Sequence, residues 1–177
     1  MNTLNNKLQL KKLFVLTIIL FISVTMSPNN VHANTEFYEA NTVTKNVTEK
    51  YFAAYFDLDF ETLKELMHDD ISFADPTADL IFHSEKVIGK DAVYENFKKG
   101  YASITEMTQT PIRTIYSSNT GIYEINIEFK FKEGANIISI NMPLVIILTI
   151  KDSKVIEHRD YGDYNHFLRQ YNDQRNK

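Results

Sequence analysis

Four polar residues of the sequence have side chains that suit proton transfer: Asp75, His158, Asp160 and Tyr51. His158 and Asp160 stand two positions apart in a segment with strand-like alternation, so a strand would place both on one face together with Ile156. Two carboxylates and an imidazole that share a cavity push each other's pKa values apart, as a general acid and a general base require. Acid–base chemistry is therefore expected if the fold gathers these residues in one pocket.

Each of the four residues also has a purely structural interpretation. Asp75 precedes Pro76 directly after an apolar strand, and Asp-Pro in that place commonly begins a turn. Asp160 can pair with an arginine at the end of a sheet, and His158 can be a hydrogen-bonded core histidine. Tyr51 lies on the apolar stripe of a helix, where packing alone would account for it. The residues by themselves leave both interpretations open.

Several other kinds of site lack support in the sequence. The chain contains no cysteine, which rules out disulfides, thiolate metal sites and a cysteine nucleophile. No spacing of His, Asp or Glu is a recognised metal-ligand motif, and neither a G-x-S-x-G turn nor a glycine-rich nucleotide loop occurs. We therefore expect no metal ion and no cofactor.

The first 33 residues have the composition of a secretory signal. Lys7, Lys11 and Lys12 precede a mainly apolar run of twelve residues that starts at Leu13, and small or short residues precede a cleavage position at Ala33. Twelve helical residues span about 18 Å, short of the roughly 30 Å of hydrocarbon in a bilayer. We expect cleavage near Ala33 rather than a stable membrane span, and a secreted or periplasmic protein.

Without that segment the chain carries 16 basic and 23 acidic residues, a formal charge of −7. An acidic domain without a stripe of Lys and Arg is a poor candidate for binding nucleic acid. Apolar residues make up 44% of the whole sequence, and Gly and Pro together only 9 residues. One domain with a packed core is therefore expected.

The pattern of apolar residues predicts helices first and strands after them. A polar lead-in over 34–41 precedes an amphipathic helix that is capped by Thr42 and whose apolar stripe begins at Val43. The further predicted elements are a helix after Asp59, a short strand at 71–73, an irregular segment over 77–90, a helix over 91–103, and strands near 109–117, 122–132, 137–150 and 154–164. Helices followed by an antiparallel meander are typical of the α+β class, with the helices on one face of the sheet.

Two stretches, Lys50 to Pro76 and the segment ending His158-Arg-Asp-Tyr161, resemble the nuclear transport factor 2-like superfamily of cone-shaped domains. That superfamily includes ketosteroid isomerases, SnoaL-type polyketide cyclases and limonene epoxide hydrolases. The resemblance covers roughly 42–104 and 137–168. It implies one domain over 42–177, with N-terminal helices packed on a curved antiparallel sheet. It also implies a pocket for a small apolar or aromatic molecule, and a homodimer.

The first stretch is similar to the isomerase pattern, in which a helix begins Tyr-x-Ala-Ala and a later Asp-Asp-x-x-x-x-Asp-Pro carries the base. That similarity implies a general base at Asp75 and an oxyanion-donating hydroxyl at Tyr51, whereas the isomerase's second donor position falls on Val145. The second stretch resembles the Trp-Arg-Asp-Tyr ending of cyclases and epoxide hydrolases, which implies a role for Asp160 and puts His158 at the Trp position. The Arg-x-Asp pair of the hydrolases falls on Ile127 and Phe129, or on Glu128 and Lys130.

Two functions are consistent with these observations. The first is an exported proton-transfer enzyme of the isomerase, cyclase or hydratase type, which acts on a small apolar ligand with an Asp base. The alternative is a non-catalytic ligand-binding or interaction module of the same fold, because this superfold hosts many unrelated functions.

Overall fold

In the computed structural model, residues 28–176 are described, so most of the predicted signal segment lies outside the described residues. The chain divides into two units, residues 1–39 and 40–177. Helix α2 spans Pro28–Phe56. The predicted lead-in over 34–41 is therefore helical, and Thr42 lies inside the helix rather than capping it. Within residues 28–176, no helix has the length and apolar character needed to cross a membrane.

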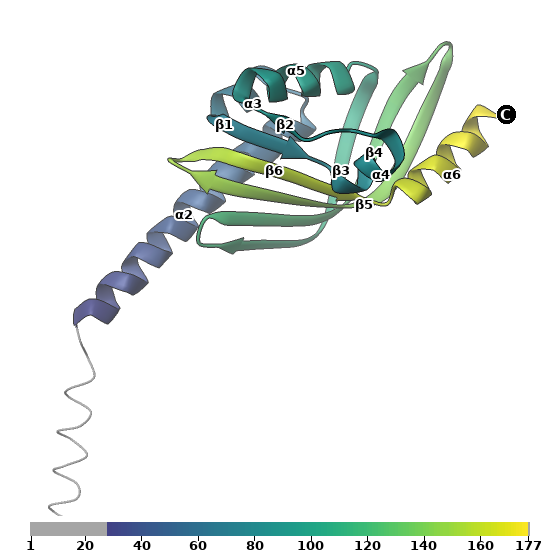
Figure 1. Cartoon of the computed structure of the whole chain (residues 1–177). Helices are drawn as coiled ribbons and strands as arrows, with labels where there is room; N and C mark the ends of the chain where they lie inside the picture. Colours follow the sequence, from purple (N-terminus) through teal and green to yellow (C-terminus); the bar gives the residue numbers. More distant parts are fainter. Residues whose placement is uncertain (1–27, 177) are drawn as a thin grey trace, which may run out of the picture. The chain divides into compact units, whose positions relative to one another are not determined.

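Six strands of the second unit form one sheet in the order β2-β1-β6-β5-β4-β3 (Figure 1). The strands are β1 (Met67–Ala74), β2 (Val87–Ile88), β3 (Ile104–Ser117), β4 (Thr120–Glu133), β5 (Asn136–Lys151) and β6 (Lys154–Gly162). β3 to β6 form the predicted antiparallel meander. β1 pairs parallel with β6, so the sheet is mixed rather than wholly antiparallel. The α+β class is confirmed.

Four shorter helices accompany the sheet: α3 (Phe60–Leu66), α4 (Pro76–Phe82), α5 (Lys90–Gly100) and α6 (Tyr164–Arg175). Figure 1 shows α5 beside β1 and α6 beside β5, and these pairs of elements are in contact. The prediction of an irregular segment over 77–90 is wrong, because α4 occupies its first part. α6 was not predicted at all. Both helices begin after an aspartate whose carboxylate caps them, Asp75 for α4 and Asp163 for α6.

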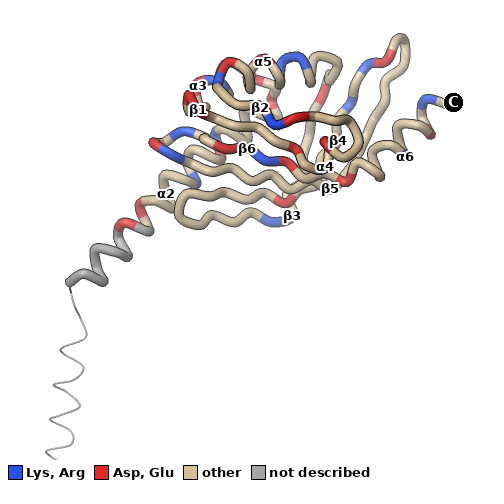
Figure 2. Tube along the Cα trace, viewed as in Figure 1, with Lys and Arg blue, Asp and Glu red and all other residues tan. Residues whose placement is uncertain are grey.

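One face of the sheet forms the core. The predicted alternation of β4 is confirmed, since Tyr123, Ile125 and Ile127 are buried. The central strand β5 carries no Lys, Arg, Asp or Glu between its first and last residues (Figure 2). In β6 the prediction for Ile156 is wrong, because the register with β5 shifts there and buries Val155 instead.

The buried face of α2 packs on the core through both aromatic and polar side chains. Tyr51 is buried as predicted and Tyr55 is buried with it, but Val43 is 41% exposed, and Thr44 and Thr48 are buried in its place. Polar side chains are tolerated there because both hydroxyls are bonded: Thr44 donates to the Ser118 carbonyl at 2.6 Å and Thr48 to the Thr44 carbonyl at 2.8 Å.

Gly121 of β4 allows this close approach of α2. A Cβ atom at this position would lie 2.9 Å from Thr48 Cγ2, so we expect Gly121→Ala to lower the free energy of unfolding by about 1–3 kcal/mol. Gly100→Ala is the control, since a Cβ there meets nothing within 4 Å. Urea unfolding followed by circular dichroism measures both variants. Wild-type stability of Gly121→Ala would contradict the packing of α2 on β4.

Candidate active site

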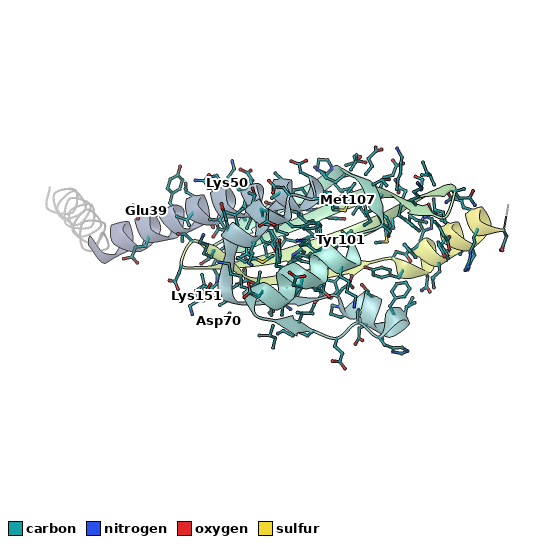
Figure 3. All side chains as sticks on the ribbon, turned by 90° about the horizontal axis from the view of Figure 1, so that it is seen from above. Glu39, Lys50, Asp70, Tyr101, Met107 and Lys151 are labelled. Atoms are coloured by element: carbon teal, nitrogen blue, oxygen red, sulfur yellow. The ribbon has the colours of Figure 1, made fainter. Side chains whose placement is uncertain are left out.

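A cavity of about 490 Å³ lies between the sheet and the helices of the second unit. Its wall includes two aspartates, Asp75 and Asp160, in largely apolar surroundings. Tyr101 follows α5 and Met107 lies on β3, and these two lining residues are labelled in Figure 3. The aromatic lining residues are Tyr55, Phe73, Phe82, Phe97, Tyr101, Phe129, Phe131, Tyr164 and Phe167. A wall of this kind suits a small apolar or aromatic molecule.

Asp160 and His158 form a buried polar pair on β6. Asp160 is 4% exposed and His158 is 0% exposed. His158 Nε2 lies 2.8 Å from Asp160 Oδ1, and His158 Nδ1 lies 3.2 Å from the Tyr51 hydroxyl. A carboxylate can only accept hydrogen bonds. When Asp160 is ionised, Nε2 therefore carries the proton that joins the pair.

Two further tyrosines extend this network into the cavity. The Tyr55 hydroxyl donates to Asp160 Oδ2 at 3.1 Å and is also hydrogen-bonded to the Tyr101 hydroxyl. A phenol has one proton to give, and that of Tyr55 is directed at Asp160. Tyr101 must therefore donate to Tyr55, so the Tyr101 oxygen faces the cavity as an acceptor.

Asp75 is held differently, as the N-cap of α4. Its Oδ1 accepts from the Thr77 N–H at 3.0 Å, the Ala78 N–H at 2.8 Å and the Thr77 hydroxyl at 2.6 Å. Its Oδ2 accepts from the Tyr164 hydroxyl at 2.5 Å. Thr77 in turn accepts from the Gly162 N–H at 2.8 Å. This carboxylate therefore connects α4 with α6 and with the end of β6.

The fold brings together all four residues that the sequence singled out, but not in one layer. Asp75 and Asp160 line the cavity, whereas His158 and Tyr51 lie behind Asp160 and are not part of the wall. Tyr51 therefore contacts His158 rather than a ligand oxygen. Val145 lies between two buried residues of β5 and is itself only half-buried, while its neighbour Leu144 lines the cavity.

The positions of the hydrolase Arg-x-Asp pair hold no such pair in either register. Ile127 and Phe129 line the cavity, and Glu128 accepts from the Ser139 hydroxyl at 2.9 Å. Lys130 pairs with Glu106 at 3.0 Å.

The sequence prediction missed three tyrosines that line the cavity: Tyr55, Tyr101 and Tyr164. Tyr55 follows Tyr51 by about one helical turn on the apolar stripe of α2, where its spacing indicates packing rather than a polar role. Tyr164 lies on α6, whose cap and aromatic spacing (Tyr164, Phe167, Tyr171) are readable in the sequence. The contact between Tyr101 and Tyr55 joins segments 46 positions apart, which no local pattern reveals.

Burial makes these tyrosines poor acids. Desolvation raises the pKa of Tyr51, Tyr55 and Tyr101 above the ordinary value of 10.0, and the charge of Asp160 raises it further. The pKa of Tyr164 is raised by burial first and then by Asp75. The four hydroxyls therefore keep their protons at neutral pH and remain hydrogen-bond donors to the network.

Stability should consequently fall at alkaline pH. The unfolded chain releases tyrosine protons near pH 10.0, whereas the folded chain retains them, so the stabilisation is complete below pH 10 and is lost above it. The slope is about 1.4 kcal/mol per pH unit for each such tyrosine, and Tyr55→Phe should remove one such contribution. Urea unfolding between pH 8 and 11 measures the slope. A slope that Tyr55→Phe leaves unchanged would contradict the burial of this hydroxyl.

Within residues 28–176, no three His, Asp or Glu side chains are arranged to hold a metal ion.

A family model described as the SnoaL-like domain matches residues 48–158. No curated protein matches the sequence. Among solved structures, a candidate SnoaL-like polyketide cyclase from Shewanella denitrificans has a TM-score of 0.67 and 20% identity, covering 75% of this chain and 98% of that one. An epoxide hydrolase of limonene epoxide hydrolase type from M. tuberculosis has a TM-score of 0.60 and 13% identity, covering 75% and 92%.

A candidate ketosteroid isomerase from Kribbella flavida has a TM-score of 0.52 and 18% identity, covering 68% of this chain and 78% of that one. At these identities the three structures share the fold with this chain. The predicted nuclear transport factor 2-like fold is thereby confirmed.

Proposed function

Since this chain belongs to the SnoaL-like domain family, we propose that it binds a small, largely apolar molecule in the cavity and accepts a proton from it at Asp160. One observation carries this proposal. Asp160 lines the cavity while His158 holds one of its oxygens from behind the wall and Tyr55, itself part of the wall, holds the other. A carboxylate with about four acceptor sites has two left for a ligand, and a general base must be within hydrogen-bond reach of the proton that it takes.

Asp75 has a different role in this proposal, although the resemblance to isomerases implies that it is the base. Its carboxylate already accepts four hydrogen bonds, three of them on Oδ1. A proton on Oδ1 would displace a donor that caps α4, and a proton on Oδ2 would have to share that oxygen with the Tyr164 hydroxyl. We therefore assign to Asp75 the role of a fixed negative charge that holds α4 and Tyr164 in place.

The proposed step is balanced within the cavity. A bond from hydrogen to carbon or oxygen of the ligand breaks, the proton moves to a free oxygen site of Asp160, and the electron pair stays on the ligand. Return of the proton to another atom completes an isomerisation. In a cyclisation the electron pair attacks a carbonyl carbon of the same ligand, the C=O π bond breaks, and the resulting alkoxide takes the proton back from Asp160. His158 and Tyr51 act as positioning residues, since they touch Asp160 or each other and not the ligand.

A second candidate, a binding module without catalysis, is favoured by one specific observation. The hydroxyl protons of Tyr55, Tyr101 and Tyr164 are all directed at protein acceptors. An enolate or other oxyanion would therefore meet no tyrosine donor in the resting cavity, and such donors commonly contribute about a hundredfold or more to rate.

The proposal includes export and assembly. Residues 1–33 would serve as the signal that directs the protein out of the cytoplasm. Two copies would pair through the outer face of the sheet, where Ile112 and Ile115 of β3 are 53% and 44% exposed.

Hydrogen–deuterium exchange tests the proposed proton transfer. The probe is 2-tetralone in D₂O, and mass spectrometry measures the rate at which deuterium enters the ketone. We expect Asp160→Asn to lower the catalysed rate by about 10²–10⁴-fold. Asp173→Asn, an exposed position on α6, is the control and should leave it unchanged.

A variant of Asp75 distinguishes the roles of the two carboxylates. Asp75→Asn keeps a side chain that can cap α4 and replaces only the oxygen that accepts from Tyr164, so it should reduce the exchange rate much less than Asp160→Asn does. Equal rates for Asp160→Asn and wild type would contradict the assignment of Asp160 as the base.

A further inference from the structure

We propose that the ligand of this cavity is an organic cation, namely a protonated amine on an apolar body. The inference rests on the proposed function in one respect, which is that the same cavity is the ligand site. It adds the charge and the polar group of the ligand, which the proposed function leaves open.

The charges of the wall point to a positive ligand. Asp75 and Asp160 line the cavity and are 7% and 4% exposed, so solvent screens them little. No Lys, Arg or His lines the cavity among the residues that the structure describes. His158 pairs with Asp160 from behind the wall, and all four hydrogen bonds that Asp75 accepts come from neutral donors. A cation inside the cavity would be attracted by both carboxylates.

The direction of the hydrogen bonds in the cavity wall also favours a positively charged ligand. Tyr164 gives its proton to Asp75, Tyr55 gives its proton to Asp160, and Tyr101 therefore gives its proton to Tyr55. These three hydroxyls offer only oxygen lone pairs to a ligand. The other lining side chains with O–H or N–H groups are exposed, namely those of Ser84, Asn96 and Ser103. The buried wall thus presents side-chain acceptors, which fit an ammonium N–H better than they fit a carbonyl or a carboxylate.

Aromatic rings next to Asp75 complete the site. The ring of Tyr164, which is bonded to Asp75, lies 5.6 Å from the ring of Phe82 at 87° and 6.1 Å from that of Phe167 at 56°. All three rings line the cavity. The faces of aromatic rings attract cations, so a cation near Asp75 would be flanked by rings as well as by negative charge.

The fields of the two carboxylates overlap on the same tyrosines. Burial is the main cause that raises the pKa of Tyr101 and of Tyr164, and the negative charges of both Asp75 and Asp160 add to it in each case. A ligand between these two tyrosines would therefore feel both charges at once.

A cationic ligand also removes a difficulty of the proposed proton transfer. When a neutral ligand loses a proton to Asp160, an anion is left in a buried wall without a side-chain donor. When a protonated amine gives an N–H proton to Asp160, the N–H bond breaks, its electron pair stays on nitrogen as a lone pair, and the ligand becomes a neutral amine. No separate oxyanion donor is then required.

Three probes that differ only in their polar group test the inference: benzylamine, benzyl alcohol and benzoate. Titration calorimetry with the whole protein at pH 7 measures each affinity. We expect benzylamine to bind at least tenfold more tightly than benzyl alcohol, and benzoate to bind more weakly than either. Asp75→Asn and Asp160→Asn should each weaken benzylamine about fivefold or more, while the exposed control Asp173→Asn should change nothing.

Benzyl alcohol shows whether the cavity survives in each variant. An Asp75→Asn protein that keeps its affinity for the alcohol and loses affinity for the amine supports the inference. Equal affinities for the three probes, or tighter binding of benzoate, would overturn the cationic ligand and leave the apolar pocket of the proposed function intact. If none of the three probes binds, both the inference and the proposed ligand pocket are wrong.

Discussion

The buried hydrogen bond between His158 and Asp160 is the interaction on which the rest of the site depends. A carboxylate that is 4% exposed is costly to bury unless its oxygens are bonded. His158 on one oxygen and Tyr55 on the other meet that requirement, and both lie on elements that the core already fixes. Tyr51 holds the far nitrogen of the imidazole. Tyr51 and Tyr55 of α2 therefore have to pack against β6 for the Asp160 carboxylate to face the cavity.

Asp75, which directly follows β1 where that strand pairs with β6, provides a second constraint on the cavity wall. By capping α4 and accepting from Tyr164 it fixes the first turn of one helix to the first residue of another. The two carboxylates thus accept hydrogen bonds mainly from neutral donors. Because the protons of these donors point at the carboxylates, the cavity wall offers mostly hydrogen-bond acceptors to a ligand. Its chemistry follows from where those protons point, which is why the direction of each hydrogen bond matters more for function than the list of lining residues.

The sequence predicted the fold class and the meander of long strands, because these depend on local periodicity and on two similar stretches. It did not predict α4 or α6, because Asp75 was expected to begin a turn and the last strand was expected to continue to residue 164, past the cap Asp163. It singled out Asp75 and Asp160 but did not predict that Asp75 caps a helix whereas Asp160 keeps acceptor sites for a ligand. This difference in role depends on the contacts of Thr77, Tyr55 and Tyr164 with the two aspartates. Two of these contacts join residues that are 105 and 89 positions apart. Local patterns in the sequence carry no information at such separations.

The most direct test of the central claim is the position of the proton on His158. ¹⁵N NMR of the imidazole in the free protein, with Asp160→Asn for comparison, measures it. If Asp160 is a carboxylate held ready to accept a proton, Nε2 must be protonated and its signal must move in Asp160→Asn. An unprotonated Nε2, with the proton on Nδ1 alone, would require Asp160 to be the donor of the 2.8 Å bond and would contradict its role as the base.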